Sequence, residues 1–168
     1  MPNWVWTRPG RLLNKEQLAA YTYAVRLLAR REYCEAELRA RLDRREIEPD
    51  DCDAVIAQLR QDNYLSDERY AESFLRSRLR KGEAPWLAAA KARPRGVNEA
   101  ALQGALSEIE DGFDAESRCR ELLSMRDPAG RRFDNEREWQ RQARFLRNKG
   151  FETAIVLRVL KERHADEA

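Results

Sequence analysis

The feature that most constrains this chain is a helical pattern that returns after 50 residues. Apolar residues recur at three- and four-residue spacing, which is typical of one helix face, and strand-like alternation is almost absent. A shift of 50 superimposes Ile47 on Val97, Cys52 on Leu102, Ile56 on Leu106 and Leu59 on Ile109. The same shape returns near the C-terminus as RFLRNKGFETAIVLRVL. Tandem units of this size predict an extended row of repeats.

We therefore predict an all-α fold, an elongated, curved array of three tandem three-helix repeats. The predicted divisions are an N-terminal tail over 1–16, repeat 1 over 17–65, repeat 2 over 66–112, repeat 3 over 113–164 and a C-terminal tail over 165–168. The tail tryptophans, Trp4 and Trp6, either fold back over repeat 1 or belong to a contact surface.

Several helix starts can be placed from their capping residues. Asn14 followed by Gln17 predicts a capping box, and Ser66 predicts the cap of the helix that carries DERYAESFLRSRLR. Pro49 suits a first helical turn. Cys34 occupies another cap position, where its thiol is a weak hydrogen-bond acceptor.

Charge is unevenly distributed, although the net charge is only +2. Residues 69–95 hold eight Lys/Arg and two acids, residues 99–116 hold six acids and no base, and residues 131–149 hold seven bases and three acids. Such segregation creates local fields that suit charged partners, although a solvated helical surface can also be patchy.

The helix after Ser66 predicts a basic stripe. At about 100° per residue, Arg69, Arg76 and Arg80 fall within about 40° of one another, opposite an apolar face. Guanidinium groups in this arrangement suit phosphates or an acidic protein surface. Arg78 lies within the apolar arc, so it either pairs with an acid of a neighbouring helix or reaches across an interface. Lys81 extends the charge beyond the helix.

Repeat 3 carries a second basic set, spaced at helical intervals and accompanied by aromatic residues. Its members are Arg137, Arg141, Arg144, Arg147 and Lys149. Trp139 is expected in the core, because aromatic residues at helical spacing usually pack inward.

Catalysis and metal binding have little support. The sole histidine, His164, lies near the C-terminal end, and neither a CxxC pair nor a phosphate-binding glycine loop is present. No window approaches the roughly 20 apolar residues of a membrane span, and MPNWVWTRPG lacks a signal-peptide core. We expect a cytoplasmic, monomeric protein that is not an enzyme and has no cofactor.

The segment DNYLSDERYAESFLRSRLRKG resembles the most characteristic segment of the RecX family, bacterial proteins that regulate the RecA recombinase. RLLARREYCEAELRARL and RFLRNKGFETAIVLRVL resemble the family's other two signatures, in the same order. The resemblance covers about residues 21–160. It implies an all-helical fold of tandem three-helix repeats.

The resemblance also implies a mechanism. RecX-like proteins bind along the filament that RecA forms on single-stranded DNA, and they usually lower strand exchange, ATP hydrolysis and co-protease activity. The candidate contacts of repeat 2 fall within a stretch that matches the family pattern DERxAxxFxxSRxRxG; they are Arg69, Arg76, Arg78, Arg80 and Lys81.

Two features depart from the family. Cys34 stands where the family often has Ser or Thr, and Pro94 interrupts an alanine-rich helix, WLAAAKARPRGV. We expect repeat 2 to pack less well than its neighbours.

Two other functions stay open. A general DNA-binding protein built of helix-turn-helix-like units would bind free DNA without RecA, although a near-neutral total charge is unusual for that class. A helical adaptor would use no nucleic acid at all.

Overall fold

The computed structural model describes residues 13–128 and 136–165, which form nine α-helices, one 3₁₀ turn and no strand. Repeat 1 consists of α1 (Lys15–Leu28), α2 (Glu35–Asp43) and α3 (Pro49–Gln61). Repeat 2 consists of α4 (Asp67–Arg80), α5 (Pro85–Ala92), the 3₁₀ turn η1 (Arg93–Arg95) and α6 (Glu99–Glu110). Repeat 3 consists of α7 (Ala115–Arg126), α8 (Glu136–Asn148) and α9 (Thr153–Ala165).

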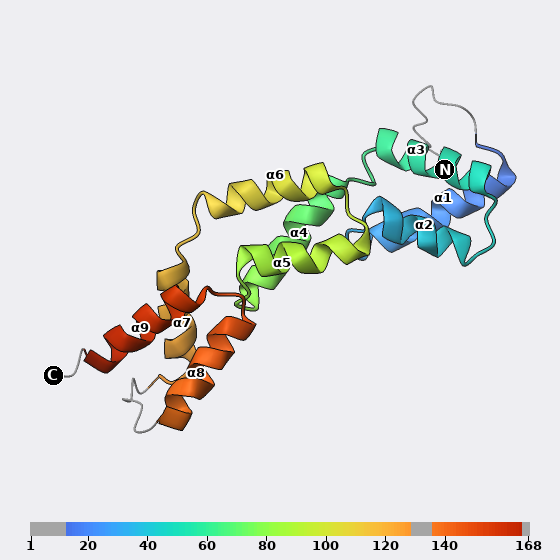
Figure 1. Ribbon diagram of the computed structural model, residues 1–168. Coiled ribbons are helices and arrows are strands. Elements are labelled where there is room, and N and C mark those ends of the chain that lie inside the picture. The colour runs from blue at the N-terminus through green and yellow to red at the C-terminus, as the bar shows by residue number, and fades with distance from the viewer. Residues whose placement is uncertain (1–12, 129–135, 166–168) are drawn as a thin grey trace, which may run out of the picture.

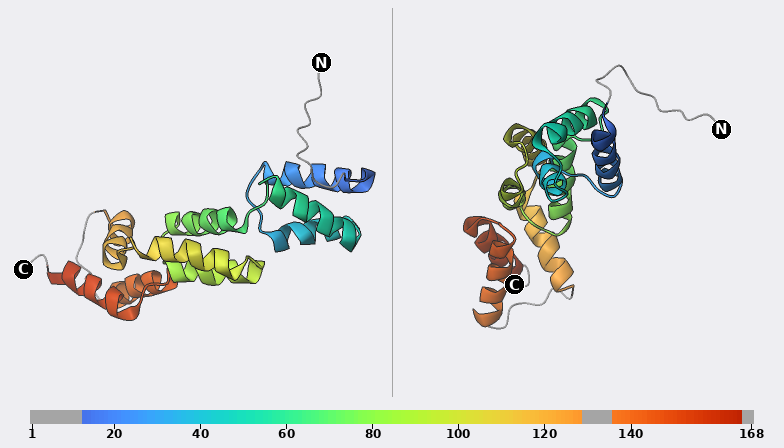
Figure 2. Two further views of the ribbon diagram at one scale, coloured as in Figure 1. Left: turned by 90° about the horizontal axis from the view of Figure 1, so that it is seen from above. Right: turned by 90° about the vertical axis from the view of Figure 1, so that its right-hand side faces the viewer.

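The three repeats lie in a row, with α1 and α9 at opposite ends of an elongated molecule (Figure 1). The views from above and from the end agree with this arrangement (Figure 2). The predicted all-α array of three-helix repeats is therefore confirmed. Trp4 and Trp6 lie outside the described residues.

Two of the predicted caps make the expected side-chain hydrogen bonds. Asn14 and Gln17 form a reciprocal capping box on α1, and the Ser66 hydroxyl accepts a hydrogen bond from the Arg69 N–H. Cys34 makes no side-chain cap bond on α2. The Glu35 N–H at this helix start instead donates to the carboxylate of Asp67, the first residue of α4.

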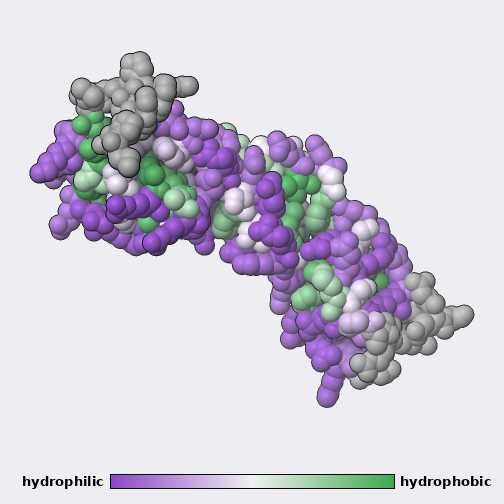
Figure 3. Space-filling model, turned by 180° about the vertical axis from the view of Figure 1, so that it is seen from behind, coloured by the Kyte–Doolittle hydropathy of each residue, from purple (hydrophilic) through white to green (hydrophobic). Residues whose placement is uncertain are grey.

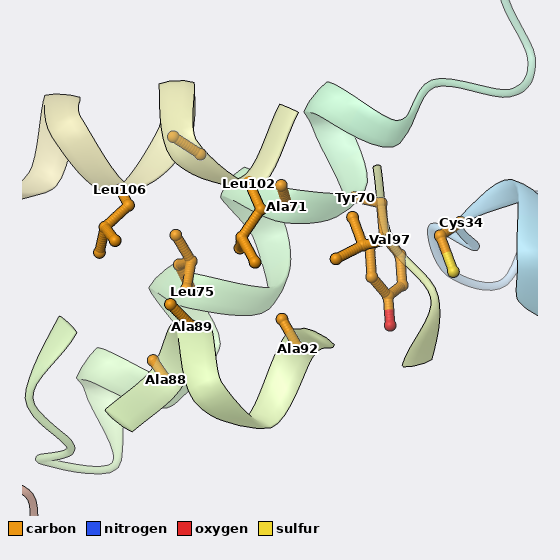
Figure 4. Packing of buried hydrophobic residues seen from close by; sticks show 11 residues of the cluster. Cys34, Tyr70, Ala71, Leu75, Ala88, Ala89, Ala92, Val97, Leu102 and Leu106 are labelled. Carbon is orange, nitrogen blue, oxygen red and sulfur yellow. The ribbon is translucent and has the colours of Figure 1, made fainter. Parts of the chain in front are cut away.

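Each repeat has its own apolar core. Repeat 1 packs around Leu38 and Leu59, repeat 2 around Leu75 and Leu102, and repeat 3 around Leu146. In Figure 4, Leu75 and Leu102 point into the space between α4, α5 and α6. Trp139 packs against the repeat 3 core, as predicted.

The alanine-rich helix of repeat 2 corrects one expectation. The α-helix does end at Ala92, and the chain continues as the 3₁₀ turn that contains Pro94. The packing is nevertheless close, because Ala88, Ala89 and Ala92 are fully buried against the other two helices of the repeat. Small side chains let α5 approach its neighbours, so the interruption leaves the core intact.

A left-handed residue joins the second and third helices of every repeat. These residues are Glu46 (φ 58°), Gly96 (φ 77°) and Gly150 (φ 94°). In repeats 1 and 3 the residue after it donates its N–H to a carbonyl five positions earlier, as in a Schellman motif: Ile47 to Leu42 and Phe151 to Leu146. The repeats therefore share a backbone turn as well as an apolar pattern.

These turns also make the junctions between repeats. A Cβ added at Gly96 would lie 2.6 Å from the Ala36 Cβ of repeat 1, and one added at Gly150 would lie 2.7 Å from the Leu87 Cβ of repeat 2. Each turn therefore packs against the first residues of the second helix in the preceding repeat. Glu46, in repeat 1, is the one of these three turn residues that is not glycine.

Candidate functional site

Arg69, the first member of the predicted stripe, is held by four hydrogen bonds within the protein. Its Nε donates to Glu32 Oε1 at 3.1 Å, and its Nη1 donates to Asn63 Oδ1 at 2.9 Å. Its Nη2 donates to the carbonyls of Asn63 and Tyr64, each at 3.0 Å. Most of the guanidinium donors are therefore occupied, and Arg69 ties two loops to the start of α4.

Arg76 and Arg80 are oriented as the sequence predicted. Both are exposed, whereas Tyr70 and Leu75 on the opposite side of α4 are buried. Within the described ranges neither arginine has a hydrogen-bond or ion-pair partner, and the same is true of the exposed Lys81 ammonium. These three cations are available to an external anion.

Arg78 forms an ion pair within the protein. Its Nη1 lies 3.5 Å from Glu83 Oε1, and its guanidinium lies 5.3 Å from the Phe74 ring centroid. Glu83 belongs to the turn after α4, so the acid comes from the adjoining turn and not from a neighbouring helix. Lys91 of α5 shares the same carboxylate at 2.7 Å. Through Glu83, these ion pairs connect α4, the turn after it and α5.

A second ionic cluster joins repeats 1 and 2. Glu37 of α2 accepts hydrogen bonds from Arg31 at 2.8 Å, from Arg95 at 2.9 Å and from the Tyr70 hydroxyl at 3.3 Å. Burial alone would raise the pKa of Glu37, but the hydrogen bonds from the two arginines hold this pKa below its ordinary value. Arg95 also lies over the Phe74 ring, 5.2 Å from its centroid.

The α8 cations predicted in repeat 3 mostly face solvent. Arg137, Arg141, Arg144 and Arg147 are exposed. Arg141 lies 3.9 Å from Glu138, at the limit of an ion pair, and the other three have no partner among the described residues. These arginines continue the basic character of the chain onto the third repeat.

The two basic sets meet where α4 and α8 end. Lys149 Nζ donates to the Lys81 carbonyl at 2.7 Å, and the Lys149 carbonyl accepts from the Ala84 N–H at 2.7 Å. Arg118 Nη2 also donates to the Leu79 carbonyl at 3.1 Å. Cations are favourable at this site because the C-terminal end of a helix carries partial negative charge. The exposed cations of repeats 2 and 3 therefore lie on either side of one fixed junction.

Sequence reasoning did not single out Arg95 and Arg118, which connect one repeat to another. No local signal distinguishes them from other surface arginines, since their partners lie 58 and 39 positions away. On the face that Figure 3 shows, hydrophilic residues surround separate hydrophobic patches.

Two further properties of the described residues bear on other functions. Neither described range contains a helix that is both long enough and apolar enough to cross a membrane. No group of three or more His, Cys, Asp or Glu side chains that could hold a metal ion occurs in these ranges.

Comparison with known proteins gave consistent matches. Two family models match the chain, the first three-helix domain of RecX over residues 20–59 and the second over residues 66–106. A regulatory protein RecX from Halorhodospira halophila is 38% identical over 128 residues, which are 76% of this chain and 78% of the relative. Another from Syntrophotalea carbinolica is 32% identical over 148 residues, covering 85% of this chain and 95% of the relative.

A solved structure has the same fold. The crystal structure of RecX from Lactobacillus salivarius superimposes with a TM-score of 0.69 at 21% identity, covering 88% of this chain and 96% of that one.

Proposed function

This chain belongs to the RecX family of regulatory proteins, and we propose on that basis that it regulates the RecA recombinase. In this proposal it binds along the RecA filament on single-stranded DNA. Binding lowers the ATPase, strand-exchange and co-protease activities of the filament. The protein has no catalytic role of its own and acts by occupying the filament.

The observation that carries the proposal is that exposed cations without a partner among the described residues occur in both of the repeats that flank the junction of repeats 2 and 3. Arg76, Arg80 and Lys81 lie on one side of it, and Arg144 and Arg147 lie on the other. An elongated body with cations on successive repeats suits a linear polyanion, because contacts on one rigid body add through effective concentration. Such binding releases counterions and so weakens as salt rises.

The test is a titration of the single-stranded-DNA-dependent ATPase of RecA with the purified protein, at about 50 and 200 mM salt. We expect inhibition with less than one protein per RecA protomer, and weaker inhibition at the higher salt. The double variant Arg76→Ala/Arg80→Ala should lose most of this inhibition. A charge-matched control, Arg41→Ala/Arg44→Ala, removes two exposed cations of repeat 1 that have no partner among the described residues.

The possible results test the proposed function and the proposed contact residues separately. Inhibition that survives in the Arg76→Ala/Arg80→Ala variant would support regulation of RecA and would remove these two residues from the contact surface. Absence of inhibition at a large excess of protein would contradict the proposed function. Equal affinity for single-stranded DNA with and without RecA would favour the general DNA-binding alternative.

A further inference from the structure

A small apolar pocket lies at the junction of repeats 2 and 3, formed by the starts of α5, α7 and α9 and the end of α6. Its volume is about 190 Å³. This is smaller than the roughly 300–1,000 Å³ of a typical small-molecule site, so it suits one or two protein side chains. The lining residues used below are Trp86, Glu110, Phe113, Phe151, Glu152 and Ile155.

The pocket has a fixed aromatic wall. The Trp86 side chain is large and apolar, yet the residue is 54% exposed. Its indole N–H donates a hydrogen bond to the Gly150 carbonyl, which holds the ring in place. Phe113 and Phe151 stack with their centroids 6.3 Å apart. An exposed tryptophan beside a preformed apolar surface is typical of a binding hot spot.

The edge of the pocket is negative. Glu110 and Glu152 are exposed, and neither side chain has a hydrogen-bond or ion-pair partner among the described residues. Glu110 and Asp111 stand at the C-terminal end of α6, whose last turn contains no basic residue. Carboxylates are unfavourable there, because that end of a helix is already partly negative. Glu152 directly precedes α9, where a carboxylate is favourable, so the uncompensated negative charge that attracts cations at this edge comes from Glu110 and Asp111.

We propose that this pocket binds a protein segment in which an apolar side chain adjoins lysine or arginine. The apolar side chain would pack between Trp86 and Ile155, and the cation would pair with Glu110 or Glu152. Phosphates would be repelled by the two carboxylates, which separates this surface from the cations of α4 and α8. The inference goes beyond the proposed function, and its test uses no recombinase and no DNA filament.

The test uses nuclear magnetic resonance of the ¹⁵N-labelled full-length protein. The Trp86 indole signal, assigned with a Trp86→Phe variant, reports on the pocket. Three short peptides of equal length are titrated: one alternating lysine and leucine, one alternating glutamate and leucine, and one alternating lysine and serine. We expect a saturable shift with the lysine–leucine peptide and much smaller shifts with the other two.

A matched pair of variants tests the role of the edge. Glu110→Gln should weaken binding of the lysine–leucine peptide about twofold or more, the effect expected for one exposed ion pair. Glu108→Gln removes an equal charge from the same helix at a residue outside the pocket, and it should leave the affinity unchanged. Equal losses in both variants would overturn the assignment of the cation to this edge.

Three other results would overturn the proposal. One is a Trp86 signal that stays unmoved by the lysine–leucine peptide at its highest soluble concentration. Another is an equal response to the glutamate–leucine or lysine–serine peptide. The last is a stronger response to a single-stranded oligonucleotide, which would assign the pocket to nucleic acid.

Discussion

Asp67 accepts a hydrogen bond from the backbone N–H of Glu35 across the junction of repeats 1 and 2, with Oδ1 and the nitrogen 2.8 Å apart. The other carboxylate oxygen accepts from the Asn98 N–H, also at 2.8 Å. One buried side chain therefore satisfies donors at the starts of α2 and α6, which belong to different repeats. Helix starts leave such N–H groups without intrahelical partners, and an anion there also interacts favourably with the helix dipole.

Replacing Asp67 should destabilise the protein strongly. We expect Asp67→Ala to lower the free energy of unfolding by about 2–4 kcal/mol, because it leaves two N–H groups without their charged acceptor. Urea denaturation followed by circular dichroism measures this loss. Asp111→Ala is the control, since Asp111 is exposed and has no side-chain partner in the described ranges. A small, equal effect of both changes would show that the shared carboxylate is unimportant.

The turn residues should respond in opposite directions to substitution. Gly96→Ala combines a positive φ with a contact of 2.6 Å to Ala36, so we expect a loss of about 1–3 kcal/mol. Glu46→Gly removes the strain of a non-glycine residue at φ 58°, and Glu46 is exposed. It should change stability little or raise it by up to about 1 kcal/mol. Thermal denaturation of both variants measures the contrast, and a loss of similar size in the two would contradict the junction's packing role.

The stability contributed by Glu37 should depend on pH. Its pKa is lowered in the folded protein by Arg31 and Arg95, so the ionised form stabilises the fold above the unfolded pKa of about 4.3. This contribution is lost as pH falls through the lower, folded value. We expect Glu37→Gln to cost about 1 kcal/mol or less at pH 7, since Arg31 and Arg95 are 47% and 43% exposed.

Urea denaturation of Glu37→Gln and the wild type at pH 7, 5 and 3 measures this difference. The gap between the two proteins should close toward the lowest pH. Glu72→Gln removes a carboxylate that has no partner among the described residues and should show no comparable trend. A gap that stays constant with pH would mean that Glu37 acts through packing alone.

Arg69→Ala should destabilise the protein, whereas Arg76→Ala should not. Arg69→Ala removes four hydrogen bonds and leaves the carbonyls of Asn63 and Tyr64 without this donor, so we expect a loss of about 1–3 kcal/mol. Arg76→Ala should leave stability within about 0.5 kcal/mol of the wild type, as is usual for an exposed side chain. Thermal melts of the two variants test this. An equally destabilised Arg76→Ala protein would show that α4 needs this side chain for folding.

The repeats and some of the helix starts could be predicted because their causes are local. Asn14 and Ser66 act on N–H groups three residues away, and the apolar face of α4 follows from helical periodicity. The 50-residue shift, together with the similar segment near the C-terminus, predicted the number and order of the repeats. The same reasoning placed Arg76 and Arg80 on the exposed side.

The role of Trp86 and the bond from Arg69 to Glu32 could not be predicted, because these partners come from distant segments. Arg69 meets Glu32, which is 37 positions away, and Trp86 meets Gly150, which is 64 positions away. Periodicity gives the direction of a side chain on its own helix and says nothing about what another repeat places opposite it. The same limit applies to the apolar pocket, which exists only between two repeats.

Because each turn packs onto the preceding repeat, the three repeats should not unfold with equal ease. The middle repeat is held from both sides, by Gly96 against Ala36 and by Gly150 against Leu87, whereas each end repeat is held at one junction. In a linear array with nearest-neighbour coupling, the ends open at lower free energy than the middle. Amide protons in α5 and α6 should therefore exchange with solvent more slowly than those in α1 or α9. Transient opening at the ends would let a long ligand be released one repeat at a time, without loss of the central repeat's structure.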